Sequence, residues 1–125
     1  MKPFHRVIMC GARDWSNAGP ILRELRRLKK EHGNKLIIIE GEAPGADQMA
    51  RVLAHQLDIH VAGVWALWET RHRGAGPQRN TAMAALQPDE VIAFHADITK
   101  SRGTADMVKQ ARALLQSDRV RVVRK

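Results

Sequence analysis

Short apolar runs alternate with amphipathic stretches along this chain, and this alternation restricts the fold more than any other feature. Within the amphipathic stretches, apolar residues recur at helical spacing, as Ile21, Leu25 and Leu28 do. Neighbouring parallel strands need a crossover connection, usually a helix, so this order predicts a Rossmann-like three-layer α/β/α sandwich with a mainly parallel sheet of about five strands. The expected strands cover residues 6–10, 36–39, 59–65, 90–94 and 119–123, and helices are expected to begin near residues 19, 46, 79 and 103.

The composition limits the domain count and the compartment. The chain has 125 residues and no break in composition, so we expect one domain over residues 1–125. The single cysteine, Cys10, cannot form an internal disulfide and is expected to be a small core residue. The sequence shows no N-terminal apolar segment of the kind that directs secretion, and no apolar run is long enough to cross a membrane. We therefore expect a cytoplasmic protein without a membrane partner.

Basic residues outnumber acidic ones, 21 to 13, and give the chain a net charge of +8. Such a charge attracts nucleotides and polyanions without identifying which one binds. Much of the excess lies in residues 23–30 and 119–125, and two interpretations remain open: a solvated helix face with a basic tail, or a nucleic-acid-binding surface. In the second case the contacts would come from Arg23, Arg26, Arg27 and Lys30.

Four glycine-containing clusters lie where an apolar pattern gives way to a loop or helix, at residues 10–14, 41–47, 74–80 and 101–106. Because the carboxyl ends of parallel strands meet at one edge of a sheet, we expect these clusters to form one crevice. Backbone amides, arginines and carboxylates would line it, which favours a nucleotide-like ligand. The candidate nucleotide-binding residues are Gly11, Arg13, Asp14, Gly41, Gly45, Asp47, Arg79, Asn80, Arg102, Gly103 and Thr104.

Two of the clusters begin helices. Residues 101–104 are either a phosphate site at a helix N-terminus or an ordinary helix cap, with Asp106 in the first turn facing the helix dipole. The glycines of 41–47 permit close backbone approach, while Asp47 could cap amides or accept hydrogen bonds from a ribose or base.

The other two clusters supply arginines. Arg13 and Asp14 could pair with one another or divide their contacts between the phosphate and a hydroxyl group of a ligand. Arg79 begins a helix directly after a glycine- and proline-containing segment, so we expect its guanidinium to point toward the same sheet edge.

A polar loop expected at residues 68–77 leaves its role open. Trp65 and Trp68 either stack on a base or belong to the core. Arg71 and Arg73 either wrap a polyanion or remain in solvent.

Several kinds of site are not expected. The six histidines show no metal-ligand spacing, so no metal is predicted. Cluster 41–47 lacks the lysine–serine pair of a P-loop and cluster 10–14 lacks the G-x-G-x-x-G spacing, so neither NAD, ATP nor another cofactor is predicted. Ser101 is expected to contact an anion rather than act as a nucleophile.

Taken in order, the motifs Gly-Ala-Arg-Asp-Trp, Gly-x-x-x-Gly-Ala-Asp, Gly-Pro-x-Arg-Asn and Arg-Gly-Thr-Ala-Asp-Met make this chain similar to a bacterial and phage family of short SLOG-superfamily domains. Relatives of that family include the YspA, DprA and lysine-decarboxylase-like (LOG) proteins. The resemblance covers residues 6 to about 123. It implies a Rossmann-like fold, a nucleotide or nucleotide-derived ligand, and a homodimer or higher homo-oligomer.

In LOG-type phosphoribohydrolases, an Arg-x-x-x-Met motif and a Gly-Gly-x-Gly-Thr-x-x-Glu motif hold the phosphate and supply the catalytic acid. Residues 79–83 match the first motif. The second is partial, because Met107 stands where the glutamate would be. If the protein is an enzyme, the resemblance implies an N-glycosidase acting on a ribosyl phosphate, with Arg79 and Asp106 as catalytic residues.

Three functions follow from these observations. The first is binding of a nucleotide or nucleotide-derived ligand at the carboxyl ends of the strands, with or without hydrolysis. The second is a DprA-like basic protein that binds single-stranded nucleic acid. The third is a non-catalytic sensor or sponge for a signalling nucleotide.

Overall fold

The computed structural model describes residues 3–66 and 74–125. In this part of the chain, five strands form one parallel sheet in the order β3-β2-β1-β4-β5, so Val7 of the central strand pairs with Ile38 on one side and Glu90 on the other. The strands are β1 (His5–Gly11), β2 (Leu36–Glu40), β3 (His60–Gly63), β4 (Glu90–Phe94) and β5 (Val120–Val123). The helices are α1 (Ala18–His32), α2 (Ala46–Gln56), α4 (Ala75–Ala84) and α5 (Arg102–Leu114).

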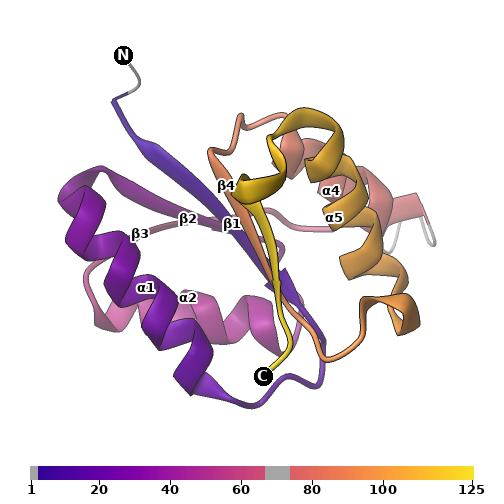
Figure 1. The fold of residues 1–125 in the computed structure, drawn as a ribbon, viewed down its shortest axis with the longest axis horizontal. Helices are drawn as coiled ribbons and strands as arrows, with labels where there is room; N and C mark the ends of the chain where they lie inside the picture. The colour runs from indigo at the N-terminus through magenta and orange to yellow at the C-terminus, as the bar shows by residue number, and fades with distance from the viewer. Residues whose placement is uncertain (1–2, 67–73) are drawn as a thin grey trace.

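The helices cover both faces of the sheet, as Figure 1 shows. Successive side chains of a strand point to opposite faces. In β1, Val7 and Met9 accordingly pack with α1 and α2, whereas Ile8 and Cys10 pack with α4 and α5. The predicted three-layer Rossmann-like sandwich is therefore confirmed.

The central strand is β1, and β2 lies beside it between β1 and β3. Both strands have neighbours on each side and helices on both faces, so both carry runs of buried apolar residues, which in β2 are followed by the buried Glu40. The hydrophobic pattern of β1 and β2 alone therefore does not show which of the two strands is central.

The third helix differs most from expectation, because α4 begins at Ala75 rather than near residue 79. Pro77 lies inside its first turn, where a missing N–H costs no helical hydrogen bond. The sequence pattern instead predicts Pro77 as the end of the polar loop at residues 68–77. Strand β3 is shorter than predicted and ends at Gly63. Within the described residues, no helix is long and apolar enough to cross a membrane.

Candidate functional site

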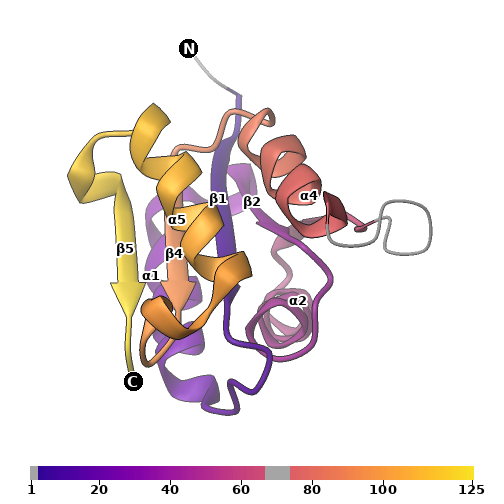
Figure 2. The same cartoon turned by 90° about the vertical axis from the view of Figure 1, so that its right-hand side faces the viewer.

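A pocket of about 690 Å³ lies at the carboxyl ends of β1 and β4. The strands β4 and β5 point toward the end of the molecule at which α5 begins (Figure 2). The walls of the pocket also include residues of α4 and of the loop and first turn of α2. A parallel sheet brings these distant segments together because all of its strands end at the same edge.

Nine of the eleven candidate nucleotide-binding residues line this pocket. The exceptions are Gly41 and Gly45, and Asp106, predicted as catalytic if the protein is an enzyme, does not line the pocket either. The nine lining residues are Gly11, Arg13, Asp14, Asp47, Arg79, Asn80, Arg102, Gly103 and Thr104.

Two glycines let the backbone segments around the pocket approach closely. A Cβ on Gly11 would overlap the carbonyl oxygen of Phe94, at the point where the ends of β1 and β4 run together. Gly45 has φ +81°, and a Cβ there would overlap the carbonyl oxygens of Ala12 and Arg13. The loop before α2 can therefore pack on the loop after β1 only with glycine at this position.

Asp47 holds the turn between β2 and α2. Its side chain is only 3% exposed, and its Oδ2 accepts hydrogen bonds from the amides of Gly41 at 3.0 Å and Ala43 at 3.4 Å. Of the two roles open from the sequence, amide capping is therefore present in the structure. Burial raises the pKa of Asp47 to about 6, although the guanidinium of Arg79 favours the charged form.

Arg79 reaches from α4 to the end of β2. Its Nη1 donates to the carbonyl of Gly41 at 3.0 Å, while its Nε is buried and has no hydrogen-bond partner in the described part of the chain. A Cβ on Gly41 would come within 2.9 Å of both Arg79 and Asp47, so this glycine makes room for the two charged side chains.

The start of α5 forms another wall of the pocket. Ser101 caps the helix, because its Oγ accepts a hydrogen bond from the amide of Thr104 at 3.2 Å. The amides of Arg102 and Gly103 precede the first hydrogen bond that an α-helix can make, so they remain suited to an anion. The serine cap is therefore present, and Arg102 and Gly103 line the pocket beside it.

Asp106 has a different position from the one expected. Its Oδ2 accepts hydrogen bonds from Asn80 and Gln110, both at 2.9 Å. Asn80 is 2% exposed and also donates to the carbonyl of Gly103 at 3.1 Å. Asn80 and Asp106 therefore link α4 to α5.

His95 and Lys100 line the pocket and were not expected there. His95 directly follows β4, and its Nδ1 accepts a hydrogen bond from the amide of Asp97 at 3.0 Å. Its place after a strand end was the signal that could have identified it. Cys10 also borders the pocket, but burial and then the charge of Asp47 raise its pKa far above the usual range, so its thiol stays protonated.

A buried carboxyl group close to the pocket was also missed. Glu40, at the end of β2, is 0% exposed, and its Oε1 accepts a hydrogen bond from the amide of Glu42 at 2.6 Å. Its Oε2 has no partner in the described part of the chain. Burial raises the pKa of Glu40 to about 7, opposed by the bond from Glu42 and assisted by Asp47.

The basic residues of α1 separate into two groups. Arg23, Arg26 and Lys30 are exposed, whereas Arg27 contacts acidic groups. The acidic partners of Arg27 are Glu24, Glu31 and Glu90. Of the residues near the third glycine cluster, Trp65 is 68% exposed, while Trp68, Arg71 and Arg73 lie outside the described residues.

The fold and the position of the pocket define a Rossmann-like α/β protein with a ligand cavity at the carboxyl ends of its strands. The model of the family described as YspA, cpYpsA-related SLOG matches residues 5–72, and the chain belongs to this family. The matched segment includes the first two glycine clusters. The comparison with curated proteins found no match.

Among solved structures, DNA processing protein A (DprA) from Streptococcus pneumoniae is similar to this chain. The TM-score is 0.58 at 16% sequence identity, and the match covers 98% of this chain and 59% of that one. At this identity the likeness concerns the fold, which extends beyond the family match to nearly the whole chain.

Proposed function

We propose that the pocket binds a nucleotide or a nucleotide-derived ligand through its phosphate group. The observation that carries the proposal is that Arg79 and the first turn of α5 line one cavity. Guanidinium groups and free helix amides are both suited to phosphate oxygens. The cavity volume also lies within the range of roughly 300–1,000 Å³ typical of small-molecule sites.

The proposed contacts follow from the positions of the side chains. Residues 102–104 bind the phosphate through amides and the Thr104 hydroxyl, and Arg79 binds it from the opposite wall. The buried Nε of Arg79 supports this role, since an unpaired buried donor gains a full hydrogen bond when an acceptor arrives. Asp14 and Asp47 are placed to accept hydrogen bonds from ribose or base.

Retention of the ligand is better supported than hydrolysis through Asp106. That carboxylate already accepts two hydrogen bonds and does not line the pocket. A phosphoribohydrolase-like reaction would need an acid near the ribosyl carbon, and Asp14 and Asp47 are the carboxylates among the described residues that line the cavity. A sensor or sponge for a signalling nucleotide needs no such acid.

Two experiments test the proposal. Mass spectrometry of small molecules released from protein purified from its native host comes first, and calorimetry with AMP and with ribose 5-phosphate follows. We expect Arg79→Ala and Thr104→Ala each to weaken binding by roughly tenfold or more, because each removes a charged or hydroxyl contact. Arg112→Ala is the matched control, since Arg112 is exposed on α5 and does not line the pocket. Unchanged affinity in both pocket variants, with unchanged melting temperature, would refute the proposed site.

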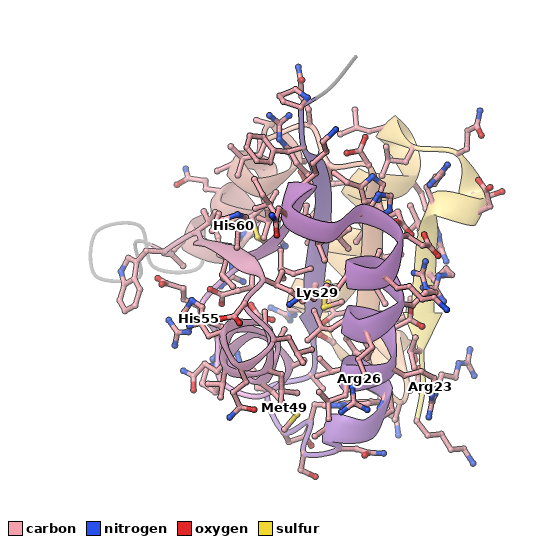
Figure 3. The ribbon with its side chains drawn as sticks, turned by 90° about the vertical axis from the view of Figure 1, so that its left-hand side faces the viewer. Arg23, Arg26, Lys29, Met49, His55 and His60 are labelled. Carbon is pink, nitrogen blue, oxygen red and sulfur yellow. The ribbon has the colours of Figure 1, made fainter. Side chains whose placement is uncertain are left out.

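Nucleic-acid binding is a second candidate, and one observation favours it. Arg23, Arg26 and Lys30 are exposed and spaced three and four residues apart, so they share one face of α1. Arg23 and Arg26 lie on the outer side of that helix (Figure 3). Lys29 differs, because its ammonium donates to the carbonyl of Leu57.

A further inference from the structure

Three side chains with metal-binding groups meet at the amino ends of the strands, away from the nucleotide pocket. His5 begins β1, Glu90 begins β4, and His32 ends α1. One ligand atom from each lies within 4.8 Å of the others. This group spans 85 residues of sequence, so no local spacing motif could have predicted it.

His5 is already in close contact with both of the other side chains. Nε2 of His5 lies 2.6 Å from Oε2 of Glu90, and the rings of His5 and His32 stack with centroids 3.6 Å apart and planes 10° apart.

The outer contacts resemble those that orient ligands in metal sites. Nδ1 of His5 lies 3.7 Å from Oδ2 of Asp89, and Oε1 of Glu90 lies 3.6 Å from Nη2 of Arg27. A metal at Nε2 leaves the ring proton of His5 on Nδ1, where it faces the Asp89 carboxylate. A carboxylate behind a histidine ligand fixes its tautomer and increases its basicity.

The group is also accessible. A cavity of about 430 Å³ adjoins it, and its walls include His5, His32, Glu31 and Asp89. Lys35 also lines this cavity, so its ammonium group offsets part of the charge of the Glu31 and Asp89 carboxylates. The space admits a water molecule as a further ligand.

We propose that His5, His32 and Glu90 bind one divalent transition-metal ion, with Zn²⁺ the best-suited chemistry. Two imidazole nitrogens and one carboxylate oxygen form a ligand set that zinc accepts, with the fourth position left to water. Stacked rings direct their lone pairs side by side, so the ring of His32 must turn about its side-chain bonds to converge with His5 on the ion. Binding therefore unstacks the rings and joins β1, β4 and α1 through one ion.

The test uses tag-free protein treated with a chelator and titrated with zinc chloride in a non-coordinating buffer. We expect one ion per chain and a higher melting temperature. His32→Ala and Glu90→Gln should each weaken zinc binding by roughly tenfold or more, since each removes one ligand. Cobalt absorption bands of a four-coordinate centre should be seen for the wild type and lost in His32→Ala.

His60→Ala is the matched control, because His60 is an exposed histidine on β3 and lies outside the group. Its affinity should equal that of the wild type. Failure of the wild type to bind zinc with one-to-one stoichiometry, or wild-type affinity in a folded His32→Ala variant, would overturn the proposal.

Discussion

At the scale of a single residue, the buried carboxyl group of Glu40 makes the stability of the protein depend on pH. Burial raises its pKa from the ordinary value of 4.5 to about 7. The folded state therefore keeps the proton over a pH range in which the unfolded chain has lost it. The stability that the protonated Glu40 contributes to the folded state is fully present below about pH 4.5 and is lost as the pH rises through about 7.

We predict that Glu40→Gln stabilises the protein at pH 8 by roughly 1–3 kcal/mol, because a neutral amide replaces a buried charge. At pH 5 the two proteins should differ little. Urea denaturation at both pH values measures this. Part of the pH dependence should persist in the variant, because Asp47 also has a raised pKa.

Asp118→Asn serves as the control, since Asp118 is exposed. It should leave stability nearly unchanged at both pH values. An equal gain from Glu40→Gln at pH 5 and pH 8 would show that packing rather than ionisation dominates at this position.

At the scale of elements, the link between α4 and α5 sets the geometry of the pocket. Arg79 lies on one helix and Thr104 on the other, and Asn80 joins them through Gly103 and Asp106. Asn80→Ala removes the side-chain donor to the Gly103 carbonyl and one of the two donors to the Asp106 carboxylate, which keeps its hydrogen bond from Gln110. We predict a loss of about 1–3 kcal/mol in the free energy of unfolding and weaker AMP binding.

Thr81→Ala is the comparison for this prediction. Thr81 also bonds across the two helices, to Gln110 at 3.2 Å, but it is exposed. Its loss should cost less than about 0.5 kcal/mol and leave AMP affinity unchanged. Equal effects of the two substitutions in denaturation and calorimetry would contradict a special role for Asn80.

The elements themselves were largely predictable, because each depends on local pattern. Ile21, Leu25 and Leu28 face the core as their spacing predicts. The start of α4 was missed because Pro77 is compatible with both a loop and the first helical turn. The bond between Asp106 and Asn80 could not be predicted, since sequence order does not show that Asn80 approaches Asp106 from another helix.

At the scale of the whole molecule, the sequence indicated the sheet edge that carries the pocket but not the cluster of His5, His32 and Glu90 at the opposite edge. Strand ends marked by glycine identified the pocket because parallel topology gathers them. His5, His32 and Glu90 carry no comparable signal, since their proximity depends on the register of β1 against β4 and on where α1 ends.

The net charge of +8 leads to a last prediction for the whole molecule. If α1 binds nucleic acid, affinity for a labelled single-stranded oligothymidine should fall steeply between 50 and 200 mM salt, because each phosphate contact contributes about 0.7 to the logarithmic salt slope. Replacing Arg23, Arg26 and Lys30 with glutamine should reduce that slope by about 2 in fluorescence anisotropy. The double variant Lys109→Gln/Arg112→Gln removes exposed charges from α5 and should change it less. Binding that is absent at 50 mM salt, or unchanged in the triple variant, would exclude α1 as a nucleic-acid surface and leave the charge to attract the pocket's own ligand.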